Sequence, residues 1–156
     1  MVPIRPPITR ASSDPGPAPA FKFLVELFGI IVAEFKECTG LGFKREAFPV
    51  KEGGVNDHVH YLPGRTEYTN IVLKYGVAES QDLWDWYYKY GLYDLKVRRA
   101  DLTILLRNVR GDVVRCWSVM DAFPVRWEGP QLNTESSQVA IETLEIAHHG
   151  LKLIKV

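Results

Sequence analysis

The sequence predicts a mainly β protein: a β-barrel of two packed antiparallel sheets, with one α-helix at about residues 80–90 and a projecting hairpin at about residues 44–62. Most segments after residue 20 alternate apolar and polar side chains with a period of two, which is typical of half-buried strands. Turn signals, among them a Gly-Gly pair and an RGD tripeptide, separate these segments at short intervals. Many short strands joined by turns favour a barrel or a closed sandwich.

The first predicted element is a hairpin that begins near Phe21. In the segment FKFLVELF, the side chains of Phe23, Val25 and Leu27 share one face with Phe21, and Gly29 permits a tight reversal into IIVAEFKE. Two extended arms then follow on either side of a Gly-Gly pair. Because these arms are more polar than the strands of a core hairpin, we expect them to project from the domain.

The middle of the chain predicts a strand and a helix. In YTNIVLKYG, the side chains of Ile71, Leu73 and Tyr75 lie on one face of a strand. In ESQDLWDWYYKYG, aromatic and apolar residues recur at helical spacing, Ser80 suits the N-cap, and Gly91 can end the helix. Aromatic residues surround nearly the whole helix, so it is either buried between its own sheet and a loop or in contact with another subunit.

The last third of the chain predicts a second hairpin and a final strand. The segments ADLTILLRN and DVVRCWSVMDAFPVRW flank the RGD tripeptide at residues 110–112. We interpret this tripeptide as a hairpin turn rather than as an adhesion motif. The segment VAIETLEIAHHGL predicts the final strand, although its composition also permits a helix.

Composition limits the classes of partner. The chain has 156 residues, of which 46% are hydrophobic, enough for the core of one domain. Nineteen Lys and Arg residues balance nineteen Asp and Glu residues, so no net positive charge attracts nucleic acid or an anionic membrane. The sequence has neither the apolar run of a secretory signal nor a membrane-spanning stretch, so we expect no nucleic-acid specificity, no direct membrane insertion and assembly in the cytoplasm.

The chain divides into two parts. Residues 1–20 hold six of the ten prolines and no aromatic residue, so they cannot pack a core and are predicted to be a Pro-rich N-terminal extension. Residues 21–156 form the predicted barrel domain. Its two cysteines, Cys38 and Cys116, are far apart in sequence, which excludes CxxC redox motifs and cysteine-rich zinc sites. We expect two buried free thiols, and a single disulfide between the two cysteines is the alternative.

Four histidines raise the question of a metal site. His58 and His60 would share a face of a strand, and His148 or His149 could add a third ligand. Neither pair has a recognised metal-binding spacing, and adjacent residues of a strand point to opposite sides. No catalytic, cofactor-binding or metal-ligating residue is therefore predicted. A small metal-dependent hydrolase that uses these histidines remains the alternative from a different class.

Several short motifs of the sequence, taken together, resemble the pattern of a known protein family. They are EGG at 52–54, LPG at 62–64, LKYG at 73–76, LWDW at 83–86, W-x-GP-x-LN at 127–133 and AIETLEIAHHGL at 140–151. Over about residues 21–153 the chain resembles the tail tube proteins of contractile phages and of phage-tail-like contractile injection systems. It is also similar to the type VI secretion tube protein.

The resemblance implies a structural function and no active site. In this family six copies close into a ring around a lumen, and the rings stack into an inner tube that a contracting sheath drives through an envelope. The implied partners are the sheath, the baseplate, the terminator or cap proteins and an effector cargo in the lumen. The implied location is a virion, or a released or membrane-docked contractile particle. A baseplate-proximal tube initiator or adaptor of the same fold is the close alternative.

Physical reasoning indicates where the copies would touch. A small β domain leaves unpaired strand edges, which a neighbouring subunit can cover, and a stack of rings also needs an element that reaches the next ring. The arm around the Gly-Gly pair suits that contact. The role of the N-terminal extension, as a clamp, a docking tail or an inert leader, stays open. The predicted subunit-interface residues are Lys51, Glu52, Gly53, Gly54, Asn56, Asp57, His58, Trp84 and Tyr88.

Overall fold

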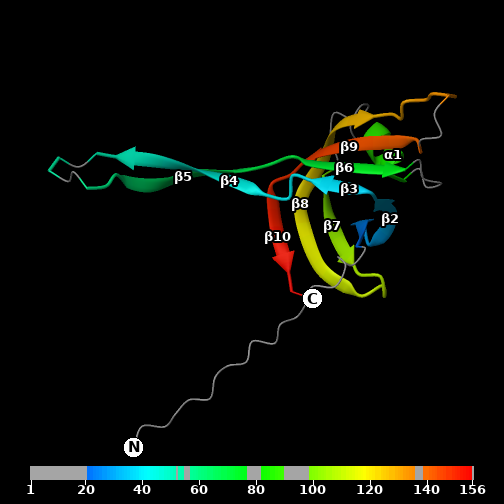
Figure 1. The fold of residues 1–156 in the computed structure, drawn as a ribbon, viewed down its shortest axis with the longest axis horizontal. Coiled ribbons are helices and arrows are strands. Elements are labelled where there is room, and N and C mark those ends of the chain that lie inside the picture. The colour runs from blue at the N-terminus through cyan, green and yellow to red at the C-terminus, as the bar shows by residue number, and fades with distance from the viewer. Residues whose placement is uncertain are drawn as a thin grey trace, which may run out of the picture.

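The computed structural model describes residues 21–51, 53–54, 57–76, 82–89, 99–135 and 139–155. In these ranges the chain forms ten strands and one helix (Figure 1). The mainly β class is confirmed, and no helix of this part is long and apolar enough to cross a membrane. The elements are β1 Lys22–Leu27, β2 Ile30–Phe35, β3 Glu37–Thr39, β4 Phe43–Val50, β5 His60–Tyr68, β6 Ile71–Gly76, α1 Asp82–Tyr87, β7 Ala100–Arg107, β8 Val113–Glu128, β9 Ile141–Ala147 and β10 Gly150–Ile154.

The long strand β8 joins two antiparallel sheets. Its first half pairs with β7 on one side and with β10 on the other, whereas its second half pairs with β9. The strand order is β2-β1-β7-β8-β9-β6-β3, with β10 beside β8. One sheet thus contains β2, β1, β7, β8 and β10, the other contains β8, β9, β6 and β3, and the strands β4 and β5 form a separate hairpin.

The predicted closed barrel is wrong in one respect, because no ladder in the described part of the chain joins the two ends of this strand order. The order runs from β2 to β3 without pairing them. At Lys36 the chain leaves the first sheet, and its backbone N–H donates to the carbonyl oxygen of Lys74 at 2.8 Å. Only Glu37–Thr39 then pair with β6. The two sheets are therefore linked at this corner by a bend of the chain and not by a ladder of hydrogen bonds.

The core lies between the two sheets. Strand β6 shows the predicted alternation, with Ile71, Leu73 and Tyr75 buried. Phe21, which the period placed on the core face, is 43% exposed because it precedes the first strand. The other large buried side chains come from both sheets and from the helix: Val25, Leu27, Phe35, Leu83, Trp86, Leu102, Ile104, Val119, Leu144 and Ile146.

The helix α1 is confirmed, although its described part, Asp82–Tyr87, is shorter than the prediction. The proposed cap Ser80 and the end at Gly91 lie outside the described residues. Leu83 and Trp86 point into the core and are 4% and 2% exposed. The helix therefore buries its apolar face against the sandwich, as amphipathic helices do.

The tight turns are confirmed where glycine was expected to allow them. Phe28 and Gly29 between β1 and β2 have φ angles of 54° and 80°, as a type I′ turn requires. In the RGD turn, Gly111 has φ 90°, and the side-chain oxygen of Asn108 accepts hydrogen bonds from the backbone N–H groups of Arg110 and Asp112. This tripeptide is therefore a hairpin turn between β7 and β8.

The final segment is extended, so its helical alternative is wrong. Strands β9 and β10 both run along β8, with Ala147 beside Phe123 and Gly150 beside Met120. They are separated only by residues 148–149, opposite Asp121, whose φ angle of 51° marks a kink in β8. The chain thus passes from one sheet to the other at this point.

Both cysteines are free thiols, as expected. Cys116 is buried and Cys38 is half-buried. Burial raises the pKa of the Cys38 thiol to about 11. The pKa of the Cys116 thiol is also raised, mainly by burial and to a smaller extent by the negative charge of Glu26. Because the thiolate is the reactive form, both side chains are expected to react slowly in the folded protein.

Candidate subunit interface

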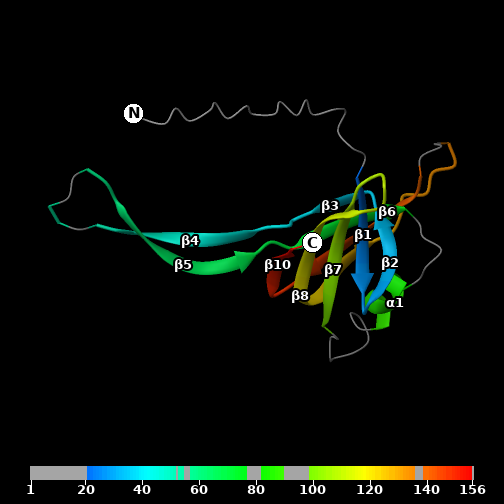
Figure 2. The ribbon, with the colours of Figure 1, turned by 90° about the horizontal axis from the view of Figure 1, so that it is seen from below.

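The hairpin of β4 and β5 extends away from the rest of the molecule, on the side opposite to α1 (Figures 1 and 2). Its ladder runs from Phe43 beside Tyr68 at the root to Val50 beside His60 at the far end. Eight residues of strand correspond to a reach of about 26 Å. The projection predicted from the sequence is confirmed, and the return strand continues to Tyr68, beyond the predicted end of the hairpin.

Large apolar side chains lie exposed on this hairpin. Phe48, Tyr61 and Leu62 are 54%, 64% and 57% exposed, and Phe43 is 68% exposed. Because Phe48 pairs with Leu62 and Pro49 with Tyr61, alternation places apolar groups on both faces of the ladder. Contiguous apolar surface on a folded subunit marks a site of contact with another molecule. Here both faces of the hairpin offer such surface.

The LPG motif shapes one of these faces. A Cβ atom at Gly64 would lie 2.4 Å from Cε2 of Phe48, so the phenyl ring lies directly against the glycine. Gly64 belongs to β5 and Phe48 to β4. Because Gly64 has no side chain, the phenyl ring of Phe48 can pack directly against the backbone of β5.

The far turn of the hairpin carries most of the predicted interface residues. Lys51, Gly53, Gly54, Asp57 and His58 are all exposed. Gly54 has φ 102°, and no atom lies within 4 Å of a Cβ atom placed at either glycine. Two further candidates, Glu52 and Asn56, lie outside the described residues.

The helical candidates lie at the other end of the molecule, Trp84 on α1 and Tyr88 directly after it (Figure 1). Trp84 is half-buried, with its ring centroid 4.5 Å from that of Trp127. Tyr88 is 40% exposed, and its ring is stacked on Trp84 with centroids 5.4 Å apart. Trp84 therefore packs against its own subunit, and the ring of Tyr88, stacked on it, is exposed at the surface.

The root of the hairpin is held by His148, which the interface prediction did not include. This residue is only 7% exposed. Its Nε2 lies 2.9 Å from the carbonyl oxygen of Thr69, and its Nδ1 lies 3.1 Å from that of Gly150. A neutral imidazole carries one N–H, so it donates to one of these two carbonyl oxygens, which accept. The imidazole therefore links the end of β5 to the start of β10, where the two strands diverge.

A second feature keeps the root tight. Gly40 has φ 85°, and a Cβ atom there would lie 1.9 Å from the carbonyl oxygen of Asn70, so only glycine fits. The side-chain amide of Asn70 donates to Oε1 of Glu145 at 2.8 Å. The hairpin therefore leaves the sandwich through fixed contacts at its base.

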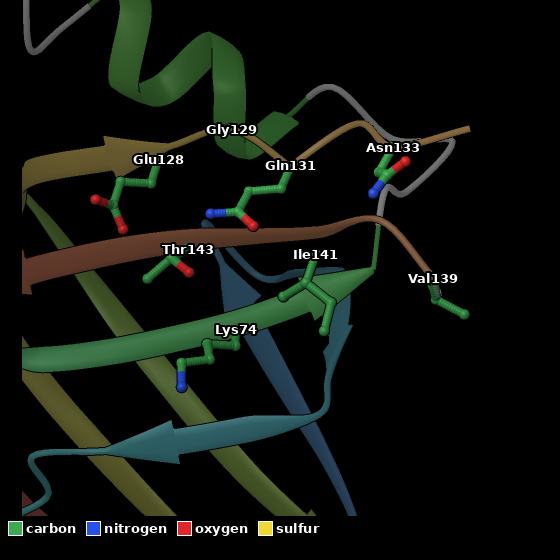
Figure 3. Close-up of a pocket in the computed structure, with 8 residues that line it drawn as sticks. All are labelled: Lys74, Glu128, Gly129, Gln131, Asn133, Val139, Ile141 and Thr143. Atoms are coloured by element: carbon green, nitrogen blue, oxygen red, sulfur yellow. The ribbon is translucent and has the colours of Figure 1, made fainter. Parts of the chain in front are cut away.

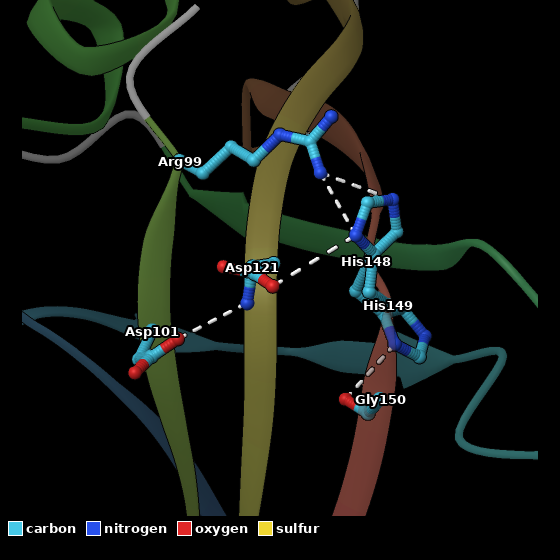
Figure 4. A network of polar contacts seen from close by, with 6 residues as sticks. All are labelled: Arg99, Asp101, Asp121, His148, His149 and Gly150. Atoms are coloured by element: carbon cyan, nitrogen blue, oxygen red, sulfur yellow. Dashed lines mark hydrogen bonds and ion pairs between the residues drawn. The ribbon is translucent and has the colours of Figure 1, made fainter.

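His149 points the other way and belongs to an exposed network (Figure 4). Its Nδ1 lies 2.8 Å from Nη1 of Arg99 and 3.8 Å from Oδ2 of Asp121. The backbone N–H of Asp121 donates to Oδ1 of Asp101 at 3.0 Å. These exposed contacts lie beside the kink in β8, opposite the break between β9 and β10.

The four histidines do not meet. The rings of His58 and His60 have centroids 4.6 Å apart at the far end of the hairpin, whereas His148 lies beside Thr69 at its root. Nine residues of strand separate these places by about 30 Å. Within the described ranges, no three His, Cys, Asp or Glu side chains form a group that could hold a metal ion.

We expect the replacement of His148 by alanine to lower the free energy of unfolding by about 1–3 kcal/mol, because a carbonyl oxygen loses its donor at a buried site. Urea denaturation of the purified subunit measures this change. Replacement of the neighbouring His149, which is exposed, is the matched control and should change the value by less than about 0.5 kcal/mol. Equal effects of the two variants would show that His148 does not hold the root.

Strand edges are also open for contact. In the described part of the chain, β10 pairs only with β8, and β3 pairs only with β6. The side chains of Lys152, Leu153 and Ile154 on β10 are exposed. Open edges bind further strands readily. They therefore offer a second type of contact, distinct from the hairpin.

Comparison with known proteins identifies the family. A family model described as the T4-like virus tail tube protein gp19 matches residues 19–152. The chain belongs to this tail tube family. The resemblance drawn from the motifs is thus confirmed, and the protein is a tail tube subunit. No curated protein sequence matches the chain significantly.

Solved structures agree with membership of the tail tube family. A chain of the sheath-tube complex of the PVC extracellular contractile injection system in the extended state is 25% identical, with a TM-score of 0.76, over 90% of this chain and 93% of that one. A chain of the anti-feeding prophage baseplate is 27% identical, with a TM-score of 0.73, over 91% and 97%. Hcp1 from Flavobacterium johnsoniae, 11% identical, shares the fold with a TM-score of 0.53 over 85% and 94%.

Proposed function

We propose that the protein is a non-enzymatic subunit that forms the inner tube of a contractile phage tail or contractile injection system, as stacked rings of six copies around a lumen. One observation carries this proposal: a tail tube subunit whose projecting hairpin exposes large apolar side chains on both faces. Exposed apolar surface of this kind marks a site of contact with other molecules. Sixfold rings are supported by the related baseplate, whose reconstruction is 6-fold symmetrised.

The two kinds of open surface suit two kinds of contact. The edges of β10 and β3 are available for pairing between neighbours within a ring, since a ring closes only through two different surfaces. The hairpin turn, with Lys51, Glu52, Gly53, Gly54, Asn56, Asp57 and His58, would contact the adjacent ring. Trp84 and Tyr88 would contribute a smaller aromatic contact. Obligate interfaces of this kind bury more than about 2,000 Å² in total.

The proposed partners follow from the assemblies in which similar chains occur. These are a sheath-tube complex, a baseplate and a sheath/tube terminator. We infer that a sheath surrounds the tube, that baseplate and terminator proteins bind its ends, and that cargo occupies the lumen. Assembly in the cytoplasm, into a virion or a released or membrane-docked particle, completes the proposal.

Negative-stain electron microscopy of the purified protein tests the proposal. We expect rings, and tubes built of stacked rings, at raised protein concentration. Light scattering coupled to size-exclusion chromatography gives the mass of the species in the same sample. A protein that stays monomeric at every concentration, and in the presence of the sheath protein, would contradict the proposed function.

The glycine turn provides a directed test. Replacing Gly53 by tryptophan should leave the subunit folded, because no atom lies within 4 Å of a Cβ atom there, yet it should reduce tube length at least several-fold. Val109, 71% exposed in the turn between β7 and β8, gives the matched control when it is replaced by tryptophan. If the tubes of both variants match the wild-type tubes, the axial contact lies in another segment.

A further inference from the structure

A groove lies at the end of the sandwich opposite to the hairpin (Figure 3). Its volume of about 810 Å³ is within the range of about 300–1,000 Å³ that is typical of ligand sites. Side chains from β6, β8, β9 and the loop after β8 line it, with Lys74, Glu128 and Thr143 on the floor. None of the residues that the proposed function uses lines this groove, so it is a separate candidate binding site.

The charged side chains of the groove are paired within the subunit. Nζ of Lys74 lies 3.1 Å from Oε1 of Glu37, and Arg126 pairs with Glu128. Lys74 and Glu128 are the charged residues among the described side chains that line the groove. Because each of them already has a partner of opposite charge, a neutral occupant fits the groove better than an ion does.

The sides of the groove combine hydrogen-bond donors with apolar groups. Oδ1 of Asn133 accepts a hydrogen bond from the backbone N–H of Glu135 at 2.9 Å, so the NH₂ group of the Asn133 amide is the end that can donate to an occupant. Gln131 adds a second side-chain amide. Val139 and Ile141 form an apolar rim and are 63% and 40% exposed. The groove thus offers amide donors beside apolar surface.

A segment of the same chain, PGPAPA at residues 15–20, has the complementary composition. It lies outside the described residues and directly precedes Phe21. It carries no charged side chain, and its three prolines lack a backbone N–H, so six carbonyl groups accompany only three N–H donors. Proline-rich segments favour the polyproline II conformation, which has no internal hydrogen bonds and leaves the carbonyl oxygens open to other donors. Grooves bind such segments at a low entropic cost because the conformation is preformed.

The described chain begins close to the groove. The start of β1 pairs with the end of β2, and the next residue, Lys36, donates its backbone N–H to the carbonyl oxygen of Lys74 on β6. A Cβ atom at Gly76 would lie 3.8 Å from Cγ1 of Val139 and 4.0 Å from Cε of Lys36, so Lys36 reaches the apolar rim. Two strand spacings, about 10 Å, thus separate the start of β1 from β6. Six residues in the polyproline II conformation span about 19 Å, which is enough to reach the groove.

We propose that the groove binds residues 15–20 of the same chain, so that the N-terminal extension is a docking tail. The segment then crosses the corner between β2 and β6, which no ladder of the described residues closes. Its carbonyl oxygens accept from the Asn133 amide, and its proline rings contact Val139 and Ile141. The inference goes beyond the proposed function and does not depend on the formation of tubes, because the contact lies within one subunit.

Disulfide formation within the full-length subunit tests this contact. The variant carries Ala18→Cys together with Val139→Cys at the rim of the groove. After mild oxidation, mass spectrometry of the digested protein should detect the link between positions 18 and 139. A non-reducing gel should show the linked product at the mass of one subunit. The native thiols of Cys38 and Cys116 give little background, since burial keeps them unreactive.

The matched control combines Ala18→Cys with Val109→Cys. Val109 is 71% exposed and lies two residues after Arg107, which pairs with Lys22 at the start of β1. Residue 18 can therefore reach both positions, and only binding in the groove favours Val139. We expect about tenfold more of the Val139 link, which corresponds to about 1.4 kcal/mol of binding. Equal yields of the two links would overturn the inference, and so would links that join different copies instead of one subunit.

Replacing prolines tests the chemistry of the segment and leaves the folded domain unchanged. The test variant adds three substitutions within the segment to the cysteine pair at 18 and 139: Pro15→Ser, Pro17→Ser and Pro19→Ser. The control variant adds three substitutions earlier in the extension: Pro3→Ser, Pro6→Ser and Pro7→Ser. Because serine restores the backbone N–H and removes the ring, the test variant should lose the preference for Val139, whereas the control variant should retain it. An unchanged link in the test variant, or an equal loss in both variants, would contradict the inference.

Discussion

Replacing Leu62 by glutamate should abolish tube formation while the subunit stays folded. Leu62 is 57% exposed on the hairpin and lies opposite Phe48, away from the core of its own subunit. Burying a leucine stabilises a contact by about 1.5–3 kcal/mol, and an unpaired carboxylate adds a cost of desolvation. Because every 1.4 kcal/mol is a tenfold change in affinity, and each subunit of a ring makes the contact, the loss accumulates over the whole ring.

Tube length by electron microscopy and the melting temperature of the free subunit are the two measurements for this variant. We expect the length to fall to single rings and the melting temperature to change by less than about 2 °C. Val109→Glu, at an exposed apolar position in the turn before β8, is the matched control and should form tubes. Wild-type tube length in the Leu62→Glu variant would show that this face of the hairpin is not buried in the assembly.

Replacing Trp86 by alanine should have the largest effect on the stability of the subunit. The indole is 2% exposed and is the largest fully buried side chain of the core. Removing a buried Trp side chain costs about 3–5 kcal/mol, because apolar burial is lost and a cavity remains. That is a large part of the 5–15 kcal/mol that stabilises a typical domain. We therefore expect a partly unfolded subunit at physiological temperature, measured by urea denaturation.

Trp84 gives the matched control for Trp86, because it is the same residue type on the same helix. It is half-buried and packs mainly on Trp127 and Tyr88. Its replacement by alanine should cost less than half as much as that of Trp86. Equal costs would show that α1 does not bury one preferred face, and a cost below about 1 kcal/mol for Trp86 would show that the helix adds little to the core.

Local periodicity was sufficient to predict most of the strands. Ile71, Leu73 and Tyr75 alternate because one face of β6 packs on the core, and this cause acts within a few residues. The tight turn at Gly29 followed from backbone sterics in the same way. The projecting hairpin was predicted from its polar residues. The structure adds that Phe48, Tyr61 and Leu62 are exposed there, which supports the proposed contact with other copies.

Closure of the barrel could not be predicted from alternation. The period of a strand assigns side chains to faces, but it does not determine which strands pair at the ends of a sheet. At Lys36 the chain bends after β2, and only three residues, Glu37–Thr39, remain to pair with β6. The break in the last strand is a similar case, because it depends on the kink at Asp121 in a strand far away in sequence.

The candidate interface residues were predicted from the polar arm and from the need to cover open strand edges, whereas the role of His148 at the root was not predicted. Its contact with the carbonyl oxygen of Thr69 forms only in the folded chain. The AIETLEIAHHGL motif, which contains this histidine, was the available signal.

A cryo-electron microscopy reconstruction of tubes assembled from the purified protein tests the central claim most directly. The account predicts stacked rings in which the β4–β5 hairpin of each subunit is buried against the adjacent ring, with Phe48, Tyr61 and Leu62 covered by other copies. Tubes in which the hairpin stays exposed to solvent, or a protein that forms neither rings nor tubes, would contradict it.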